Sequence, residues 1–191
     1  KKLKTILTNK KILLAASTHQ GEEEILIQLA NKLRKKGNNN TIIIIVPRHV
    51  KRSYSIQNLV KSAGYDIKCR SKKELPEKTD YFYLADTMGE MGSLIEISNL
   101  VFVAGSLVPA GGHNPAEAAN FGKSVIMGPY TEKCNAQIND LVWSGGAIKI
   151  EKNKSFKNHF VNIVNELLNE PLRLEDMGKN AMEASGYAQL R

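Results

Sequence analysis

Short runs of consecutive apolar residues alternate along the chain with segments in which apolar residues recur every three to four positions. The first run spans residues 12–16 and is long enough for one buried strand. In the next segment, residues 22–36, the apolar side chains fall on one face of a helix; they are Ile25, Leu26, Leu29, Ala30 and Leu33. Acidic residues 22–24 and basic residues 34–36 indicate the two ends of that helix, and Gly37 terminates it.

The same alternation continues to the end of the chain. It predicts strands at residues 41–46, near 67, and at 81–84, 100–104, 124–127 and 147. It predicts helices at 55–63, 94–98, from 114, at about 133–143, and in the tail at 155–168 and 171–184. Strands separated by helical crossovers form a parallel sheet covered on both faces. We therefore predict an α/β fold, a Rossmann-like three-layer parallel sheet, with residues 1–191 as a single domain.

Four polar loops directly follow predicted strands. They span residues 17–21, 47–49, 86–90 and 105–114. The carboxyl ends of parallel strands lie at one edge of the sheet, where such folds bind their ligands. We therefore expect these four loops to converge on a single site.

The loop before residue 114 contains a glycine pair that leads into a predicted helix start. Asn114 is a favoured N-cap, Pro115 suits the first helical position, and Glu117 can complete a capping box. The first amides of a helix attract anions, and Gly112 lets a phosphate approach the backbone. The alternative is a well-capped helix start without a ligand. Glu117 likewise either closes the cap or turns outward to accept hydrogen bonds from ribose hydroxyls.

The other loops offer further polar contacts. Arg48 follows Pro47 at the end of a strand, where a guanidinium can hold a phosphate with two hydrogen bonds. The loop at 86–90 has backbone donors around Gly89 and a carboxylate at Glu90, which suits a base or sugar edge. A solvated basic turn and a turn capped by Asp86 or Thr87, respectively, explain the same residues.

Two histidines also lie on these loops. His19 and His113 are in loops rather than on apolar faces, so a phosphate contact is favoured over a core position. Their spacing does not suggest metal ligands, and no Ser-His-Asp order can be assigned from spacing alone.

Composition limits the class of protein. The 191 residues have a net charge of +8, which favours an anionic partner, although a lysine-rich and asparagine-rich composition would give the same charge. The two cysteines are far apart and lack metal-ligand spacing, which fits a reducing, cytosol-facing compartment. The longest apolar run, residues 41–46, is too short to cross a bilayer, and no signal-peptide pattern opens the chain.

Four segments together resemble one family. ASTHQGEE at residues 16–23, PRH at 47–49 with Arg52, DTMGE at 86–90 and GGHNP at 111–115 are similar in order and spacing to the C-terminal half of 3-deoxy-D-manno-octulosonic acid (Kdo) transferase. The resemblance covers nearly all of the chain. It departs from the family at Gln20, where an acidic residue is more frequent, and at Ala116 and Ala118, where bulkier or more rigid residues are frequent.

The resemblance implies the C-terminal lobe of a GT-B glycosyltransferase, which binds the sugar nucleotide CMP-Kdo. The residues it implies as CMP contacts are Pro47, Arg48, Met88, Gly89, Glu90, Asn114, Pro115, Ala116 and Glu117. His19, Arg52 and Gly112 are weaker candidates. It implies no metal and no cofactor, because positive groups and helix-terminal amides would stabilise the leaving phosphate.

The resemblance also implies what lies outside this chain. In the family, an N-terminal lobe carries the catalytic glutamate and the membrane anchor and binds the lipid A precursor. We therefore expect no catalytic residue here, and a soluble chain that recognises the donor but is inactive alone. The full-length protein is expected at the cytoplasmic face of the bacterial inner membrane.

Two other functions fit some of the same residues. A GT-B protein that uses a UDP-sugar, such as an epimerase or a cell-wall glycosyltransferase, would have the same sheet edge. A basic α/β nucleic-acid-binding module would explain the charge, but the chain lacks interleaved aromatic residues or a recognisable motif of that class. We therefore expect no nucleic-acid partner.

Overall fold

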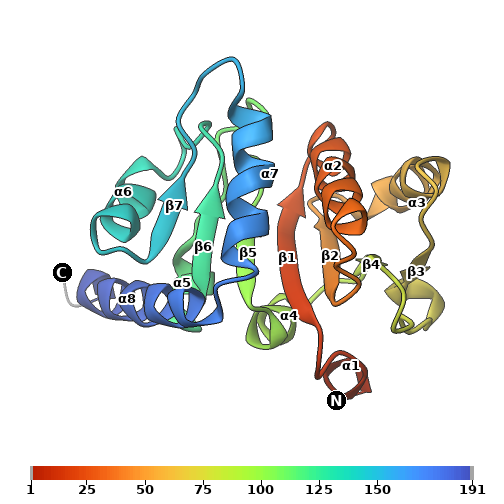
Figure 1. Cartoon of the computed structure of the whole chain (residues 1–191). Helices are drawn as coiled ribbons and strands as arrows, with labels where there is room; N and C mark the ends of the chain where they lie inside the picture. Colours follow the sequence, from red (N-terminus) through yellow and green to blue (C-terminus); the bar gives the residue numbers. More distant parts are fainter. Residues whose placement is uncertain (1, 190–191) are drawn as a thin grey trace.

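The computed structural model describes residues 2–189, with side chains described up to residue 186, and it is built on one parallel sheet between two layers of helices (Figure 1). The seven strands follow the order β3-β4-β2-β1-β5-β6-β7. They are β1 (Lys11–Thr18), β2 (Thr41–Pro47), β3 (Ile67–Cys69), β4 (Phe82–Leu84), β5 (Leu100–Val103), β6 (Ser124–Met127) and β7 (Ala147–Lys149). The strand order reverses next to β1, which places β2 on one side of it and β5 on the other.

The strands consist of continuous apolar runs because both faces of the sheet are covered. In β2, Ile43 and Ile45 belong to the core on one face, while Ile42 and Ile44 belong to the core on the other. The pairing of Leu13 with Ile43 and of Leu13 with Leu100 sets the register of the three central strands. A shift by one residue would exchange the side chains between the two cores.

Helices cover both faces. They are α1 (Lys2–Ile6), α2 (Glu22–Lys35), α3 (Ser53–Ser62), α4 (Met91–Ile97), α5 (Ala116–Asn120), α6 (Asn135–Trp143), α7 (Phe156–Leu167) and α8 (Pro171–Gln189), with short 3-10 turns at Val50–Arg52 and Arg70–Lys72. Helices α2 and α7 lie over one face of the sheet (Figure 1). Apolar side chains of α2, α3 and α7 form one core with the sheet, and those of α4, α5 and α6 form the other. Full burial of a side chain such as Phe102 or Phe160 contributes roughly 1.5–3 kcal/mol.

The fold class predicted from the sequence is confirmed, and the predicted strands are all present. Helix α2 ends as expected, because Gly37 adopts a φ of 68° and the Asn38 N–H donates to the Leu33 carbonyl at 3.0 Å. Two elements differ. The amino-terminal helix α1 was not predicted, and α5 has only five residues. Among the described residues, no helix combines the length and hydrophobicity that crossing a membrane requires.

Candidate functional site

The loops after β1, β2 and β5 meet at the carboxyl edge of the sheet. The Arg48 N–H donates to the Thr18 carbonyl at 3.0 Å, and the Ala104 N–H donates to the Ala16 carbonyl at 2.9 Å. Between these two acceptors, Ser17 adopts a left-handed φ of 65° at a β-bulge. A bulge there redirects the strand end, so the loop carrying His19 lies between the other two.

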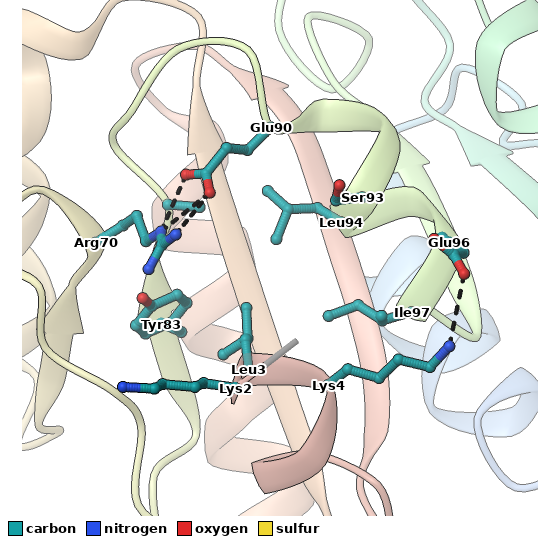
Figure 2. Close-up of a pocket in the computed structure, with 11 residues that line it drawn as sticks. Lys2, Leu3, Lys4, Arg70, Tyr83, Glu90, Ser93, Leu94, Glu96 and Ile97 are labelled. Carbon is teal, nitrogen blue, oxygen red and sulfur yellow. Dashed lines mark hydrogen bonds and ion pairs between the residues drawn. The ribbon is translucent and has the colours of Figure 1, made fainter.

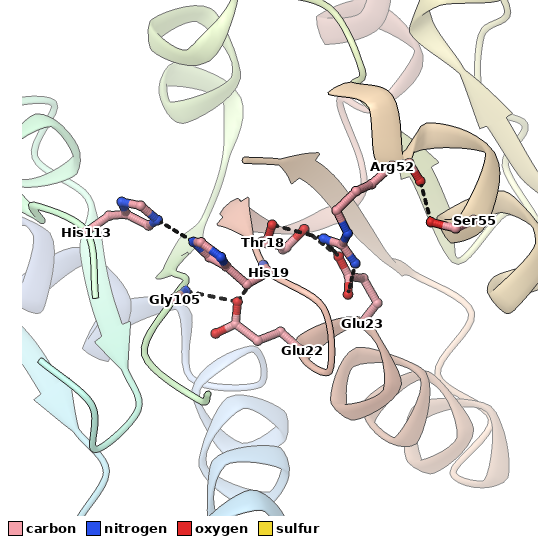
Figure 3. A network of polar contacts seen from close by, with 8 residues as sticks. All are labelled: Thr18, His19, Glu22, Glu23, Arg52, Ser55, Gly105 and His113. Atoms are coloured by element: carbon pink, nitrogen blue, oxygen red, sulfur yellow. Dashed lines mark hydrogen bonds and ion pairs between the residues drawn. The ribbon is translucent and has the colours of Figure 1, made fainter. Parts of the chain in front are cut away.

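Glu22 fixes the loops after β1 and β5 to one another. Its side chain is completely buried and accepts hydrogen bonds from four backbone N–H groups, those of His19, Gly105, Ser106 and Leu107, at 2.9–3.1 Å. Burial raises the pKa of the Glu22 carboxyl, and the four backbone donors oppose this shift. From the sequence, Glu22 was predicted only to be an acidic residue in the first turn of α2. The structure instead makes Glu22 the anchor of two loops (Figure 3).

Arg52 is engaged within the protein rather than free for a ligand. Its guanidinium donates to both carboxylate oxygens of the buried Glu23, at 2.8 and 3.0 Å, and to the Thr18 carbonyl at 3.2 Å (Figure 3). The Thr18 hydroxyl donates to the same carboxylate at 2.8 Å. This arrangement ties the start of α3 to the loop after β1. Arg52 therefore supports the shape of the edge.

His19 and His113 come together from loops 94 residues apart. Their Nε2 atoms lie 2.9 Å apart, and the rings stack with centroids 5.1 Å apart and an interplanar angle of 14° (Figure 3). A hydrogen bond at this distance needs a proton on only one of the two nitrogens. His49 approaches from the third loop, with its ring centroid 6.3 Å from that of His19.

The surroundings of this pair are positively charged. Burial lowers the pKa of both His19 and His113 below 6.5, and nearby cationic groups lower them further. The groups that act on His19 are His49, Arg52, Arg48 and Lys133. Those that act on His113 include Arg48, Lys133 and His49. Because Glu22 and Glu23 are buried and already hydrogen-bonded, this edge suits an anion.

Glycines bring the backbone and the cations close together. The imidazoles of His19 and His113 lie so near Gly105 that a Cβ there would be 3.1 Å from the His113 ring. A Cβ on Gly111, whose φ is 90°, would be 2.8 Å from the Lys133 stem. Gly112 is equally constrained, because its Cβ would be 3.0 Å from the Tyr130 carbonyl oxygen. Lys133 thus lies across Gly111, a position that its sequence context did not suggest.

The helix start differs from the one predicted at Asn114, because Pro115 is the N-cap residue of α5, which begins at Ala116 and has five residues. Asn114 Oδ1 accepts the Ala116 N–H at 2.9 Å and so satisfies one backbone donor at this helix start. The Glu117 side chain is exposed and, among the described residues, has no hydrogen-bond or ion-pair partner, so it does not close a capping box. The outward alternative for Glu117 is the one found. Because α5 has only five residues, its macrodipole is small. The attraction of its amino-terminal end for anions therefore depends mainly on backbone N–H groups without intrahelical partners.

The fourth loop, after β4, is held by serines. The Asp86 carboxylate accepts hydrogen bonds from the hydroxyls of Ser53 and Ser71 and from the Ser71 N–H. Burial raises the pKa of Asp86, but these hydrogen bonds lower it more strongly, so the net direction is downward. Asp86 therefore fixes this loop to α3 and to the turn after β3, and it does not cap α4.

Glu90 points toward Arg70 at the rim of a cavity of about 630 Å³ (Figure 2). Arg70 donates to both carboxylate oxygens, with a shortest distance of 2.8 Å, and the Thr87 hydroxyl also bonds to Glu90. The hydrogen bonds from Arg70 and Thr87 lower the pKa of Glu90. The sequence suggested a carboxylate free for a ligand. In the structure, a ligand would meet a carboxylate that is already paired.

The starts of α4 and α5 lie near one another. A Cβ on Gly92 would be 4.0 Å from a Glu117 carboxylate oxygen and 3.3 Å from the Phe121 ring. The segment at 88–90 precedes α4 directly, and the segment at 114–117 opens α5. Met88 is 85% exposed. Two predicted segments far apart in the sequence therefore border the same stretch of the edge.

The predicted site residues thus form two neighbouring groups. Pro47, Arg48, Gly112 and His113 join His19 around the histidine pair, while Met88, Gly89, Glu90 and residues 114–117 lie beside the starts of α4 and α5. The sequence reading missed the roles of Glu22, Glu23, Arg70, Asp86 and Lys133. A run of acids directly after Gly21 was the available signal for Glu22 and Glu23. Within the described part of the chain, no three His, Cys, Asp or Glu side chains are grouped as metal ligands.

Comparison with known proteins identifies relatives over nearly the whole chain. The 3-deoxy-D-manno-octulosonic acid transferase of Rickettsia prowazekii (strain Madrid E) is 32% identical over 177 residues, which cover 93% of this chain. The chain spans 38% of the length of that transferase. No protein-family model matches.

Solved structures agree with this relationship. The C-terminal CMP-Kdo binding domain of WaaA from Acinetobacter baumannii superposes with a TM-score of 0.86 at 27% identity, covering 96% of this chain and 94% of that one. The C-terminal domain of a glycosyl transferase group 1 family protein from Francisella tularensis shares the fold, with a TM-score of 0.61 at 12% identity over 94% of this chain and 86% of that one. The expected resemblance is confirmed: the chain belongs to the 3-deoxy-D-manno-octulosonic acid transferase family and corresponds to its C-terminal domain, with the Rossmann-like fold of a GT-B glycosyltransferase lobe.

Proposed function

We propose that this chain is the donor-binding half of a glycosyltransferase that transfers Kdo from CMP-Kdo to a lipid A precursor. The observation that carries the proposal is the positively charged carboxyl edge, where Arg48 has no side-chain partner among the described residues and lies near enough to His19 and His113 for its charge to lower the pKa of both. The relationship to a domain described as CMP-Kdo binding supports the identity of the donor.

The phosphate of the donor would lie against the loops after β2 and β5. There the Arg48 guanidinium can donate two parallel hydrogen bonds to a phosphate. The backbone N–H groups near Asn114 and the imidazole of His113 provide further donors, and Gly112 leaves room for close approach. These groups would stabilise the charge that develops on CMP as it leaves.

The nucleoside would lie between the starts of α4 and α5. Glu117, exposed and unpaired, is available to accept hydrogen bonds from the ribose hydroxyls. Met88 and the backbone around Gly89 would face the cytosine, and Glu90 would be held in place by Arg70. The remaining proposed contacts, Pro47, Pro115 and Ala116, would shape the walls. His19 would act through His113, and Arg52 through Glu23.

The reaction itself needs groups that we assign to an N-terminal lobe. There a base would take the proton of an acceptor hydroxyl as its oxygen attacks the anomeric carbon with inversion. The bond from that carbon to the phosphate oxygen breaks, and its electron pair leaves with CMP. We propose no catalytic residue in this chain, and we assign the lipid A precursor and the membrane surface to the full-length protein.

Isothermal titration of CMP into the chain tests this proposal. We expect measurable binding that Arg48→Ala weakens by ~1–3 kcal/mol, the range for losing a charge-assisted contact. Lys36→Ala is the matched control, because Lys36 is also an exposed cation but follows α2 at the opposite end of that helix. An equal loss in both variants would indicate a general charge effect.

Competition between CMP and UDP distinguishes a CMP-Kdo donor from a UDP-sugar donor. The groups proposed to contact the base, Met88 and the backbone around Gly89, should discriminate cytosine from uracil, so CMP should displace UDP at comparable concentrations. Tighter binding of UDP would contradict the assignment of CMP-Kdo as donor.

A further inference from the structure

Lys133 is a cationic residue at this site, and it is not among the residues proposed to contact CMP. Its N–H donates to the Gly111 carbonyl at 3.0 Å, and its aliphatic stem lies across the same glycine. Its ammonium group has no hydrogen-bond or ion-pair partner within the described chain. An unpaired cation held in place by backbone contacts is arranged to meet an anion.

Lys133 and Arg48 flank the histidine pair from opposite sides. Arg48 follows β2 and Lys133 follows β6, while His19 and His113 follow the intervening strands β1 and β5. Neighbouring strands are about 4.8 Å apart, so the ends of β2 and β6 are separated by roughly 14 Å. One phosphate group is much smaller than this distance. Arg48 and Lys133 therefore reach the histidine pair from backbone positions on either side of it.

The direction of the donor follows from the order of the strands. The nucleoside is assigned between the loop after β4 and the start of α5, and the phosphate between Arg48, which follows β2, and the loop after β5. The next positions along the same edge are Gly111 and Lys133, which follows β6. The sugar attached to the phosphate would occupy that end. Kdo is an octulosonic acid, so this sugar carries a carboxylate in addition to the phosphate of CMP.

We propose that Lys133, positioned over Gly111 beside the His19–His113 pair, binds the carboxylate of the donor sugar and makes this lobe selective for a sugar acid. This inference rests on the proposed function. Carboxylates near the subsite do not compete for the ammonium group, because Glu22 is buried among backbone donors and Glu23 is paired with Arg52. The exposed Glu132 is adjacent in sequence but forms no ion pair with Lys133.

The test compares CMP, which lacks the carboxylate, with freshly prepared CMP-Kdo, which has it. Lys133→Met keeps an unbranched stem over Gly111 and removes the charge. We expect it to weaken CMP-Kdo binding about tenfold while changing CMP affinity less than about twofold. Lys133→Arg keeps a positive charge and should retain most of the affinity for CMP-Kdo. Lys36→Met is the remote control and should change neither.

The outcomes are distinguishable. An equal weakening of CMP and CMP-Kdo by Lys133→Met would make Lys133 a phosphate contact, and unchanged binding of both would remove it from the site; either result overturns the inference and leaves the proposed function standing. Failure of the unchanged chain to bind CMP or CMP-Kdo would contradict the proposed function, and the inference with it. Unchanged CMP affinity in Lys133→Met also shows that the variant is folded.

Discussion

At the scale of single residues, the histidine pair gives the edge a defined response to pH. Burial and neighbouring cations lower the pKa values of His19 and His113. Between these lowered values and about 6.5, the unfolded chain binds more protons than the native one. The pair therefore contributes its full stabilisation above pH about 6.5 and loses it as the pH falls through the native pKa values.

Arg48→Ala should shift both titrations upward. Removing one positive neighbour lowers the cost of charging either imidazole, so the midpoints of His19 and His113 should move toward 6.5. Saturating CMP should move them in the same direction in the unchanged chain, because a bound phosphate favours the protonated rings. NMR titration of the imidazole Cε1–H signals measures both effects. Midpoints above 6.5 in the free chain would contradict the cationic surroundings described here.

The role of a loop side chain could be predicted from the sequence where its hydrogen-bond partner is a neighbour in the sequence. A role for Asn114 at a helix start follows from a local pattern, and its Oδ1 accepts the Ala116 N–H, although Pro115 and not Asn114 is the N-cap residue. Glu90 could not be assigned in this way, because its partner Arg70 lies on another strand connection 20 residues away. The position of Lys133 could not be predicted from the sequence either, because it depends on the contact of its aliphatic stem with Gly111, 22 residues earlier in the chain.

At the scale of elements, Glu22 links the start of α2 to the loop after β5. Glu22→Ala should destabilise the chain by roughly 3–5 kcal/mol, because it leaves several buried backbone N–H groups without an acceptor. Urea unfolding measures this change. Glu24→Ala is the matched control in the same helical turn; Glu24 is exposed, and its loss should cost less than about 1 kcal/mol.

The behaviour of Glu22→Gln refines this prediction. An amide can accept some of the same hydrogen bonds through its oxygen, but its NH₂ group would face other donors. Its stability should lie between those of the parent chain and Glu22→Ala. If Glu22→Ala were as stable as Glu24→Ala, the loops after β1 and β5 would not depend on this carboxylate.

Elements with strong local patterns were predicted well, and the others were not. β2 consists of consecutive isoleucines bounded by polar loops, and α2 has charged ends that match its dipole. A helix was predicted from Asn114, whereas α5 begins at Ala116, and Gly122, with a φ of 66°, ends it after five residues. α1 has only five residues and none of them is fully buried, so the spacing of Leu3 and Ile6 was too short a pattern to identify a helix.

At the scale of the whole molecule, one sheet determines where function can be located. Because every strand pair is parallel, each polar loop that follows a strand lies on the same side of the molecule. This convergence could be predicted from strand and helix alternation alone. The pairing of His19 with His113 could not, because it depends on the order in which β1 and β5 become neighbours.

The most direct test of a donor site at this edge is a map of backbone amide chemical shifts while CMP is added to ¹⁵N-labelled chain. The account predicts the largest changes at His19, Arg48, Gly112 and His113, with further changes at the start of α5. Residues 36–40, at the opposite end of α2, should not change. Changes concentrated at that opposite end, or none at the histidine pair, would contradict the placement of the nucleotide.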